Sequence, residues 1–234
     1  METKSALEKN FIRVFLFSAI AGIILVLILL GWKGQAVINR RREDEKILRQ
    51  VVSDISLSDK VKKEEIAVLV SVNPDIEDSS KKARCLQIEA GVRHALMEAG
   101  INVLNSTDKD LLAKENSNEA SSVKITLYID EDPEINSENV YAIYNDNFYS
   151  KIISNSRLAD IMERYTAGSA GLVPVSIGAA GSNAPALSDC TNPGTLMLVS
   201  YPVDEDIKLS VNRLAKGMAQ GLIVAINEIY EEES

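Results

Sequence analysis

The sequence has very few of the side chains that most catalytic sites need. Among its 234 residues there is one histidine, His94, and there are two cysteines, Cys85 and Cys190. Most catalytic zinc sites use two or three imidazoles, and two cysteines are too few for a structural zinc site by themselves. We interpret His94 as a solvated or partly buried structural residue of a predicted helix. The two cysteines either form a disulfide, if the domain lies outside the cytoplasm, or remain partly buried thiols, which we favour.

Nucleotide-binding motifs and basic surface are also missing. No P-loop and no G-x-G-x-x-G follows a predicted strand, and Gly178-Ala179-Ala180-Gly181 is too weak to indicate a phosphate site. The sequence has 34 Asp and Glu against 25 Lys and Arg, and residues 61–234 hold 27 of the acids but only 15 of the cations. Such an acidic region argues against nucleic acid as a partner and against flat binding to anionic lipid.

One long apolar run is present near the N-terminus. Val14–Trp32, VFLFSAIAGIILVLILLGW, has 19 residues and no charge. As a helix rising about 1.5 Å per residue, it is close to the roughly 30 Å of a bilayer's hydrocarbon core. A cleaved signal peptide has a shorter apolar core of about 7–15 residues. We therefore expect a short tail over residues 1–13 and a single transmembrane helix over residues 14–32.

A charged segment, residues 33–63, follows the predicted anchor. Opposite charges at i,i+4 spacing, Arg41–Glu45 and Glu45–Arg49, predict a helix over residues 35–52. It is either a solvated stalk, which we favour, or a short dimerising coil, and residues 53–63 are predicted to be a polar linker. Arg40-Arg41-Arg42 would place the C-terminal domain in the cytoplasm by the positive-inside rule, although a long domain can override that rule.

Residues 64–234 predict one α/β domain with a sizeable core. Short apolar runs alternate with helical patterns, which predicts a mainly parallel sheet of about five or six strands with helices on both faces. Glycines and small residues without a strong period predict that residues 166–193 are mostly loop. The predicted strands are 65–72, 101–104, 123–129, 140–144 and 195–200. The predicted helices are 79–99, 108–114, 149–165 and 205–230.

The first long helix of this domain has a predicted core-facing stripe. Its apolar residues recur at helical spacing. They are Ala83, Leu86, Ala90, Val92, Ala95 and Leu96.

Two groups of acids follow predicted strands, where α/β folds usually bind ligands. The first group follows strand 65–72 and the second follows strand 123–129. They comprise Asp75, Glu77, Asp78, Asp130, Glu131, Asp132 and Glu134. The first group could hold a hard cation, but acids that begin a helix and complement its dipole are the favoured interpretation. For the second group we favour a solvated turn.

Several segments of the domain, taken in order, resemble one enzyme family. IEAGVRHALMEAGINVLNSTDKD (88–110), VKITLYID (123–130), ENVYAIYND (138–146) and SRLADIM (156–162) have the order and pattern of its successive helices and strands. NAPALSDCTNPGTLMLVS (183–200) and LAKGMAQGLIVAI (214–226) resemble its last strand and closing helix. The family is that of the zinc-dependent N-acetylmuramoyl-L-alanine amidases, cell-wall hydrolases with an α/β fold, and the resemblance covers roughly residues 65–230.

The family's functional residues are not found at the matching positions. Its Gly-His pair corresponds to Val72-Asn73-Pro74, its ligand glutamate falls near Lys81-Lys82, and its second ligand histidine corresponds to Tyr128. Its catalytic Glu corresponds to Ser200, and its Thr-Arg element corresponds to Ser106-Thr107 without the Arg. The resemblance therefore implies that the family's zinc chemistry is lost, with no catalytic, cofactor-binding or metal residues and no cofactor.

The resemblance implies a membrane-anchored, non-catalytic amidase-like domain of the bacterial cell envelope. It would bind peptidoglycan or an envelope protein, and its anchor would be oriented with the C-terminal domain outside the cytoplasm. Two alternatives stay open. One is an α/β binding or assembly module unrelated to the wall, since fold analogy is a weak argument for function. The other is a hydrolase that uses carboxylates such as Asp75, Asp130 or Glu131.

Overall fold

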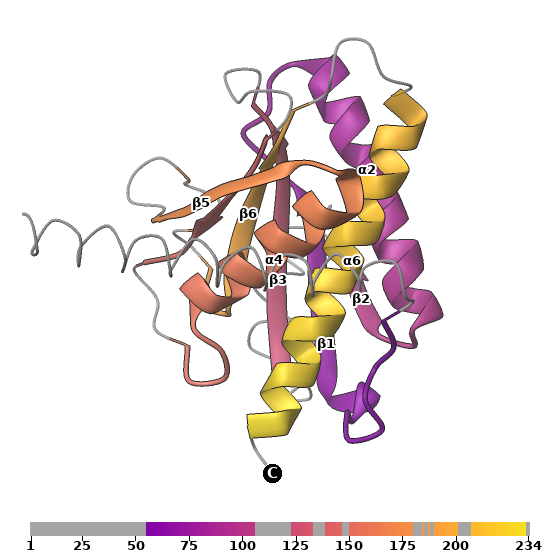
Figure 1. The fold of residues 1–234 in the computed structure, drawn as a ribbon, viewed down its shortest axis with the longest axis vertical. Coiled ribbons are helices and arrows are strands. Elements are labelled where there is room, and N and C mark those ends of the chain that lie inside the picture. Colours follow the sequence, from indigo (N-terminus) through magenta and orange to yellow (C-terminus); the bar gives the residue numbers. More distant parts are fainter. Residues whose placement is uncertain are drawn as a thin grey trace, which may run out of the picture. The chain divides into compact units, whose positions relative to one another are not determined.

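The fold of the protein is shown by a computed structural model (Figure 1). The chain divides into two compact units, Met1–Lys46 and Ile47–Ser234. The structure describes residues 55–105, 123–132, 139–146, 150–179, 184, 187, 190–200 and 207–232. The predicted anchor, the predicted stalk and the helix predicted at 108–114 lie outside these residues. None of the helices in the described ranges is both long enough and apolar enough to cross a membrane.

The described part of the second unit alternates strands and helices, as the sequence predicts. Its strands are β1 (Ile66–Val72), β2 (Asn102–Asn105), β3 (Val123–Glu131), β4 (Asn139–Tyr144), β5 (Val173–Ala179) and β6 (Gly194–Val199). Its helices are the short 3-10 helix η1 (Lys63–Glu65) and the α-helices α2 (Ser79–Glu98), α4 (Asn155–Ala170) and α6 (Ile207–Glu232).

The six strands form one mixed sheet in the order β2-β1-β3-β6-β4-β5. Parallel pairs join β2, β1, β3 and β6, and β5 is parallel to β4, but β4 runs antiparallel to β6. The prediction of a mainly parallel sheet is therefore wrong. The reason is the short connection from β3 to β4, residues 132–138, because a strand that continues in parallel needs a crossover of about a dozen residues or more.

Strand β5 occupies part of the segment predicted to be loop, so that prediction is wrong for residues 173–179. β5 lies at the edge of the sheet and pairs only with β4. Pro174 is tolerated there because an edge strand does not need every backbone donor. The backbone N–H of Val175 donates instead to Glu163 Oε1 of α4, at 3.1 Å. The sequence did not predict this strand because its small residues and its proline give no clear alternation of apolar and polar residues.

One face of the sheet is packed against the three α-helices. Alternate residues of the strands, such as Ile125 and Leu127 of β3 and Met197 of β6, are buried in a core that all three helices share. α6 lies between α2 and α4 and packs against both (Figure 1). The described helices therefore cover one face. The prediction of helices on both faces stays a prediction for the other face, and the helix predicted at 108–114 lies outside the described residues.

Glycines allow α6 and α4 to approach closely. A Cβ atom placed on Gly217 would lie 2.7 Å from both the Thr166 Cα and the Tyr165 carbonyl oxygen. On Gly221 it would lie 2.9 Å from the Met162 sulfur. Real Cβ atoms do not approach other heavy atoms this closely. Gly217 therefore requires glycine because its neighbours are backbone atoms, whereas a side chain at Gly221 would require the Met162 side chain to move.

Residues 55–62, part of the predicted linker, lie along the C-terminal half of α6. Ser58 N–H donates to Asn227 Oδ1 at 2.9 Å, and Asn227 Nδ2 donates to the Ser56 carbonyl at 3.1 Å. Ile55 and Leu57 pack against the core. The side-chain amide of Asn227 on α6 thus holds this segment through two hydrogen bonds.

Candidate functional site

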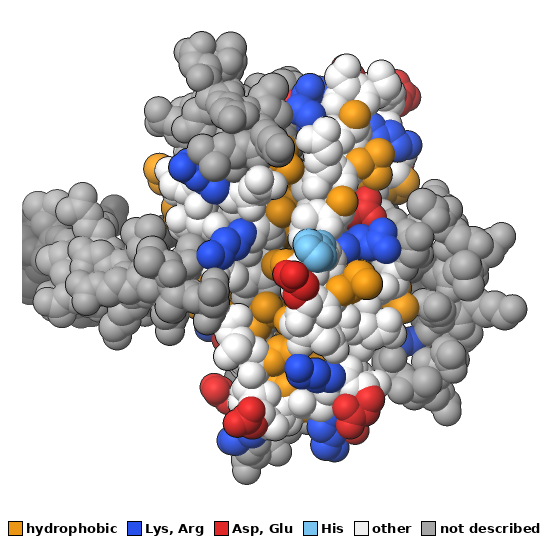
Figure 2. Space-filling view, turned by 90° about the vertical axis from the view of Figure 1, so that its right-hand side faces the viewer, with side chains coloured by type: hydrophobic (Ala, Val, Ile, Leu, Met, Phe, Trp, Pro, Cys, Tyr) orange, Lys and Arg blue, Asp and Glu red, His pale blue; other side chains and the backbone are white. Residues whose placement is uncertain are grey.

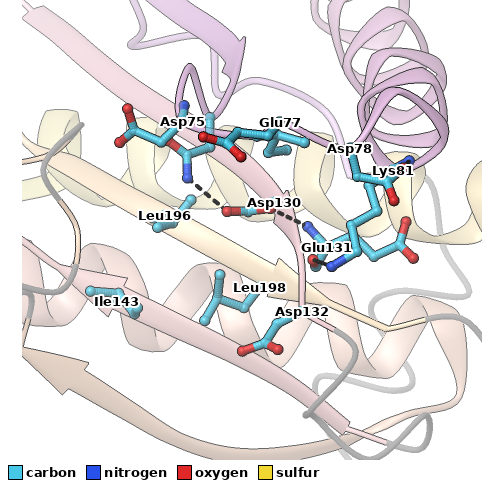
Figure 3. Close-up of a pocket in the computed structure, with 12 residues that line it drawn as sticks. Asp75, Glu77, Asp78, Lys81, Asp130, Glu131, Asp132, Ile143, Leu196 and Leu198 are labelled. Atoms are coloured by element: carbon cyan, nitrogen blue, oxygen red, sulfur yellow. Dashed lines mark hydrogen bonds between the residues drawn. The ribbon is translucent and has the colours of Figure 1, made fainter.

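An open pocket of about 490 Å³ lies where β1 and β3 end (Figure 3). It is lined by Asn73, Asp75, Ile76, Glu77, Asp78, Lys81, Asp130, Glu131, Asp132, Ile143, Leu196 and Leu198. The structure thus brings the two predicted groups of acids together, as expected for the carboxyl ends of neighbouring parallel strands. Glu134 lies outside the described residues.

The apolar part of the pocket comes from the sheet itself. Leu196 and Leu198 of β6 alternate with Met197 and Val199, so they face away from the three helices. Ile143 of β4 lies opposite Leu196 in the antiparallel pair. The sequence did not indicate this apolar surface, because the pairing of β4 with β6 cannot be read from either strand alone.

Asp78 is the N-terminal cap of α2. Its side chain accepts hydrogen bonds from the backbone N–H groups of Ser80, at 2.7 Å, and Lys81, at 3.0 Å. The bond from Lys81, followed by that from Ser80, contributes most to holding the pKa of the Asp78 carboxyl below its usual value. For Asp78, the favoured interpretation of an acid that begins a helix is confirmed.

Asp130 is held by Asn73 at the junction of β1 and β3. Asn73 Nδ2 donates to Asp130 Oδ2 at 2.6 Å, and the Asn73 backbone N–H donates to the Ile129 carbonyl at 2.8 Å. The other carboxylate oxygen, Asp130 Oδ1, accepts from the Glu131 N–H at 2.7 Å. Both oxygens of Asp130 therefore have partners within the protein.

Glu131 forms a two-point ion pair with Arg84 of α2. Arg84 Nε donates to Glu131 Oε2 at 2.7 Å, and Arg84 Nη2 donates to Glu131 Oε1 at 2.6 Å. The two side chains are 30% and 10% exposed. Lys81 Nζ reaches the Glu131 carbonyl oxygen at 3.5 Å. The sequence analysis did not single out Arg84, and its position one helical turn after Lys81 is the only signal it gave.

The donor set does not fit a catalytic zinc ion. Within the described ranges, no three His, Cys, Asp or Glu side chains are placed to hold a metal together. His94 has a 76% exposed side chain on α2, with Nε2 3.6 Å from Glu98 Oε1, and it does not line the pocket. The carboxylates of Asp130 and Glu131 already bind Asn73 and Arg84. We therefore derive no reaction step through zinc.

Both cysteines are buried free thiols. Burial, reinforced by the charges of Asp130 and Glu131, raises the pKa of Cys85 to about 12. The Cys190 thiol donates to the Asn192 carbonyl at 3.3 Å. A thiol with so high a pKa as that of Cys85 is not a nucleophile near neutral pH.

The positions that the resemblance matched to functional residues are spread over the site. Asn73 and Lys81 line the pocket. Tyr128 packs in the apolar cluster that includes Ile143 and Leu196. Ser200 is buried just after β6. Lys82 is exposed on α2, and Ser106-Thr107 lies outside the described residues.

The electrostatics of the pocket favour a particular class of ligand. Among the described residues that line it, six are carboxylates and one, Lys81, is a cation. Asp75 and Glu77 are exposed at its rim. A concave surface of one charge sign focuses its field on ligands of the opposite sign. The arrangement suits binding of a group that carries positive charge beside an apolar portion.

The fold is similar to that of several solved enzymes. The N-acetylmuramyl-L-alanine amidase Ami1 from Mycobacterium smegmatis has a TM-score of 0.55 and 14% identity, over 74% of this chain and 100% of that one. Ami1 from Mycobacterium abscessus gives a TM-score of 0.52 and 14% identity, over 70% of this chain and 99% of that one. The N-acetylmuramoyl-L-alanine amidase from Clostridium difficile 630 gives a TM-score of 0.51 and 18% identity, over 68% of this chain and 96% of that one.

Sequence comparisons give no such likeness. No protein-family model matches the sequence, and no curated protein matches it. Structures with 14% and 18% identity establish a shared fold rather than a shared activity. The described domain therefore has the α/β fold of the N-acetylmuramoyl-L-alanine amidases.

Proposed function

We propose that this chain is a membrane-anchored, non-catalytic amidase-like domain of the bacterial cell envelope. Its pocket binds peptidoglycan or an envelope protein, and residues 14–32 hold it at the membrane with the domain outside the cytoplasm. The fold is that of cell-wall amidases, and the apolar run Val14–Trp32 is long enough to span a bilayer. A domain that binds wall material has its ligand on the outer side of that membrane.

The observation that carries the proposal is the chemistry at the carboxyl ends of β1 and β3. Asn73, at the position matched to the family's Gly-His pair, donates its amide to Asp130. Lys81, near the position matched to the ligand glutamate, is a cation and reaches the Glu131 carbonyl. A positive side chain at this place opposes a divalent metal, whereas the open acidic pocket beside it remains able to bind a ligand.

The full-length chain, purified in detergent, tests catalysis and binding separately. We expect less than stoichiometric zinc after purification and no release of peptide from peptidoglycan. Tight zinc at one ion per chain, with amidase activity, would contradict the non-catalytic part of the proposal. Sedimentation with insoluble peptidoglycan then measures binding.

Charge reversal at the pocket rim identifies the surface responsible for binding. Asp75→Lys reverses a charge at the rim of the pocket. Asp59→Lys makes the same change at an exposed residue of the segment 55–62, which lies along α6. We expect Asp75→Lys to reduce retention at least about tenfold, equivalent to about 1.4 kcal/mol, and Asp59→Lys to leave it unchanged. Equal effects of the two variants would show that binding is not at the pocket.

Digestion of intact cells tests the orientation of the anchor. We expect a protease added outside to cut residues 62–234, whereas full protection would place the domain in the cytoplasm and remove the wall from consideration.

The second candidate function is an α/β binding module unrelated to the wall. The acidity of the pocket favours it, because a basic segment of a protein partner would satisfy the same carboxylates. Absence of retention on peptidoglycan, together with a partner that Asp75→Lys releases and Asp59→Lys retains, would establish this alternative.

A further inference from the structure

The buried and exposed sides of α2 differ from the sequence prediction. The predicted core residues Ala83, Leu86 and Ala90 are exposed, and the core face consists of Cys85, Ile88, Val92 and Leu96. The prediction is wrong for those three positions because both sides of α2 contain apolar residues, so spacing alone does not show which side is buried. Figure 2 shows the exposed side, with His94 in pale blue.

The orientation of α2 carries Lys81 over the pocket. Position 81 comes four residues before Cys85 and seven before Ile88, so the three share one face of the helix. Cys85 and Ile88 are buried in the core, whereas Lys81, near the start of the helix, is partly exposed and lines the pocket. Figure 3 shows its side chain reaching towards the end of β3. The neighbouring Lys82 is exposed and does not line the pocket.

Cations of α2 offset the negative charge at one end of the pocket. Arg84 forms its two-point ion pair with Glu131, and Lys81 Nζ lies 3.5 Å from the Glu131 carbonyl oxygen. The Asp78 carboxylate accepts two backbone hydrogen bonds as the cap of the same helix. The acids nearest α2 are therefore already paired or hydrogen-bonded within the protein.

The opposite end of the pocket keeps its negative charge. Asp75 and Glu77 are exposed, and no cation in the described ranges forms an ion pair with either carboxylate. In Figure 3 the two side chains lie beside each other, on the side of the pocket away from Lys81. A cationic group of a ligand therefore gains most at this end.

An apolar wall accompanies this charged end. Ile143, Leu196 and Leu198 line the same pocket. Ile143 and Leu196 are buried, but Leu198 is only half-buried and leaves apolar surface open to the pocket. An aliphatic chain that lies on Leu198 would remove this surface from water, which is favourable. A ligand that fits both features has a cation at the end of an aliphatic chain.

We propose that the pocket binds the side chain of a lysine, or of another diamino acid, within a short peptide. The ammonium group lies at Asp75 and Glu77, and the aliphatic part of the side chain lies on Leu198. The two carboxylates and the ammonium group are complementary in charge. The stem of a lysine side chain commonly covers apolar surface while its charged head stays in water. This inference rests on the proposed function, because it names the ligand chemistry of the same pocket.

The size of the pocket and the arrangement of its acids favour this ligand over two others. The volume of about 490 Å³ is within the range of about 300–1,000 Å³ for small-ligand pockets, whereas a folded protein needs a contact of about 800 Å². An ammonium group is a compact charge that Asp75 and Glu77 can share. A guanidinium group instead pairs with both oxygens of one carboxylate, so an arginine peptide should bind more weakly.

Titration calorimetry of the full-length chain in detergent tests the ligand class. The probes are acetylated and amidated Ala-X-Ala peptides, in which only X carries a charge. We expect saturable binding when X is lysine. Norleucine, which lacks the ammonium group, and diaminopropionic acid, which lacks most of the aliphatic chain, should each bind at least about tenfold more weakly. No binding of the lysine peptide, or equal binding of the norleucine, diaminopropionic acid or arginine peptide, would overturn the proposal.

Two pairs of variants show where the lysine peptide binds. Asp75→Asn should weaken binding by about threefold, and Asp59→Asn, at an exposed residue of the segment 55–62, should leave it unchanged. Lys81→Met should tighten binding by about threefold, because it removes a positive charge from the pocket, whereas Lys82→Met should not change it. Circular dichroism should show that all four variants are folded. Equal effects within either pair, or weaker binding by Lys81→Met, would overturn the proposal.

The ligand class and the proposed function can fail separately. Retention on peptidoglycan that Asp75→Lys abolishes, without binding of the lysine peptide, would overturn the ligand class and keep the pocket as the binding site for the wall. Binding of the lysine peptide at the pocket, without retention on peptidoglycan, would support the ligand class and overturn binding to the wall.

Discussion

On one face of the sheet, Met197 of β6 is fully buried in the core shared with the three α-helices. On the other face its neighbour Leu198 is half-buried in the wall of an open pocket. The helical face is apolar and closely packed, whereas the pocket face combines apolar residues with six carboxylates. This difference places most of the stability of the domain on one face and its capacity to bind ligands on the other.

The largest effect should come from truncating neighbouring residues of β6. Met197→Ala empties a fully buried site, and we expect it to lower the free energy of unfolding by about 3 kcal/mol. Leu198→Ala removes a half-buried side chain and should reduce stability by less than about 1 kcal/mol. Urea denaturation of the two variants measures both values. Similar losses would mean that the two faces contribute equally to stability.

A smaller effect tests how closely the helical face is packed. Gly217→Ala adds a methyl group 2.7 Å from backbone atoms of α4, and we expect a loss of about 2 kcal/mol from overpacking. Intrinsic helix propensity alone predicts the opposite, a gain of about 1 kcal/mol. Asn212→Ala, at an exposed position of the same helix, is the control and should be close to neutral. A more stable Gly217→Ala protein would show that the α4–α6 contact can accommodate an added methyl group without strain.

Removal of the Asn227 side chain should have a local effect. Asn227→Ala deletes the hydrogen bonds to Ser58 N–H and the Ser56 carbonyl, with an expected cost of about 1 kcal/mol. Hydrogen exchange should accelerate at the Ser58 amide while β1 and β3 stay protected. Arg213→Ala, an exposed change on the same helix, should alter neither. Global loss of protection would mean that the segment on α6 belongs to the core itself.

The smallest effects concern two carboxyl groups of α2, one at the pocket and one towards the core. The backbone N–H groups of Lys81 and Ser80 lower the pKa of Asp78 from its usual 3.8. Its stabilising contribution is therefore complete above pH 3.8 and is lost as the pH falls through the lower folded pKa. Asp78→Asn should reduce the melting temperature at pH 7, and that deficit should shrink as the pH falls below 3.8.

The pKa of Glu89 shifts in the opposite direction from that of Asp78, so its effect on stability has the opposite dependence on pH. Burial raises its pKa above the usual 4.5, although Arg93, 3.7 Å away, partly counters this. The folded state then holds a proton that the unfolded state has released, so stability falls as the pH rises from 4.5 through the raised folded pKa. Glu89→Gln should therefore raise the melting temperature at pH 7 and leave it unchanged below pH 4.5. An equal gain at both pH values would exclude titration of Glu89 as the cause.

Much of the fold could be predicted because buried strands and helices leave strong local patterns. β1 is a β-branched apolar run, β3 alternates apolar residues with polar ones, and α6 has apolar residues at regular helical spacing. The direction of β4 and the presence of β5 could not be predicted, because both depend on pairing between segments distant in sequence. The acids at the two strand ends predicted the location of the pocket. Its apolar part and Arg84 were missed, because tertiary packing alone decides which face of a strand or helix they occupy.

The position of α6 has a consequence for the order in which the domain can form during synthesis. α6 follows all the other described elements in the chain and packs against both α2 and α4, and its Asn227 also binds Ser58, 169 positions earlier. The apolar faces of β1 and α2 therefore have no complete partner until α6 has been made. Long-range contacts of this kind slow folding and leave the unfinished chain exposed to aggregation. A chain that stops before α6 would lack the helix that joins α2 and α4 in the core.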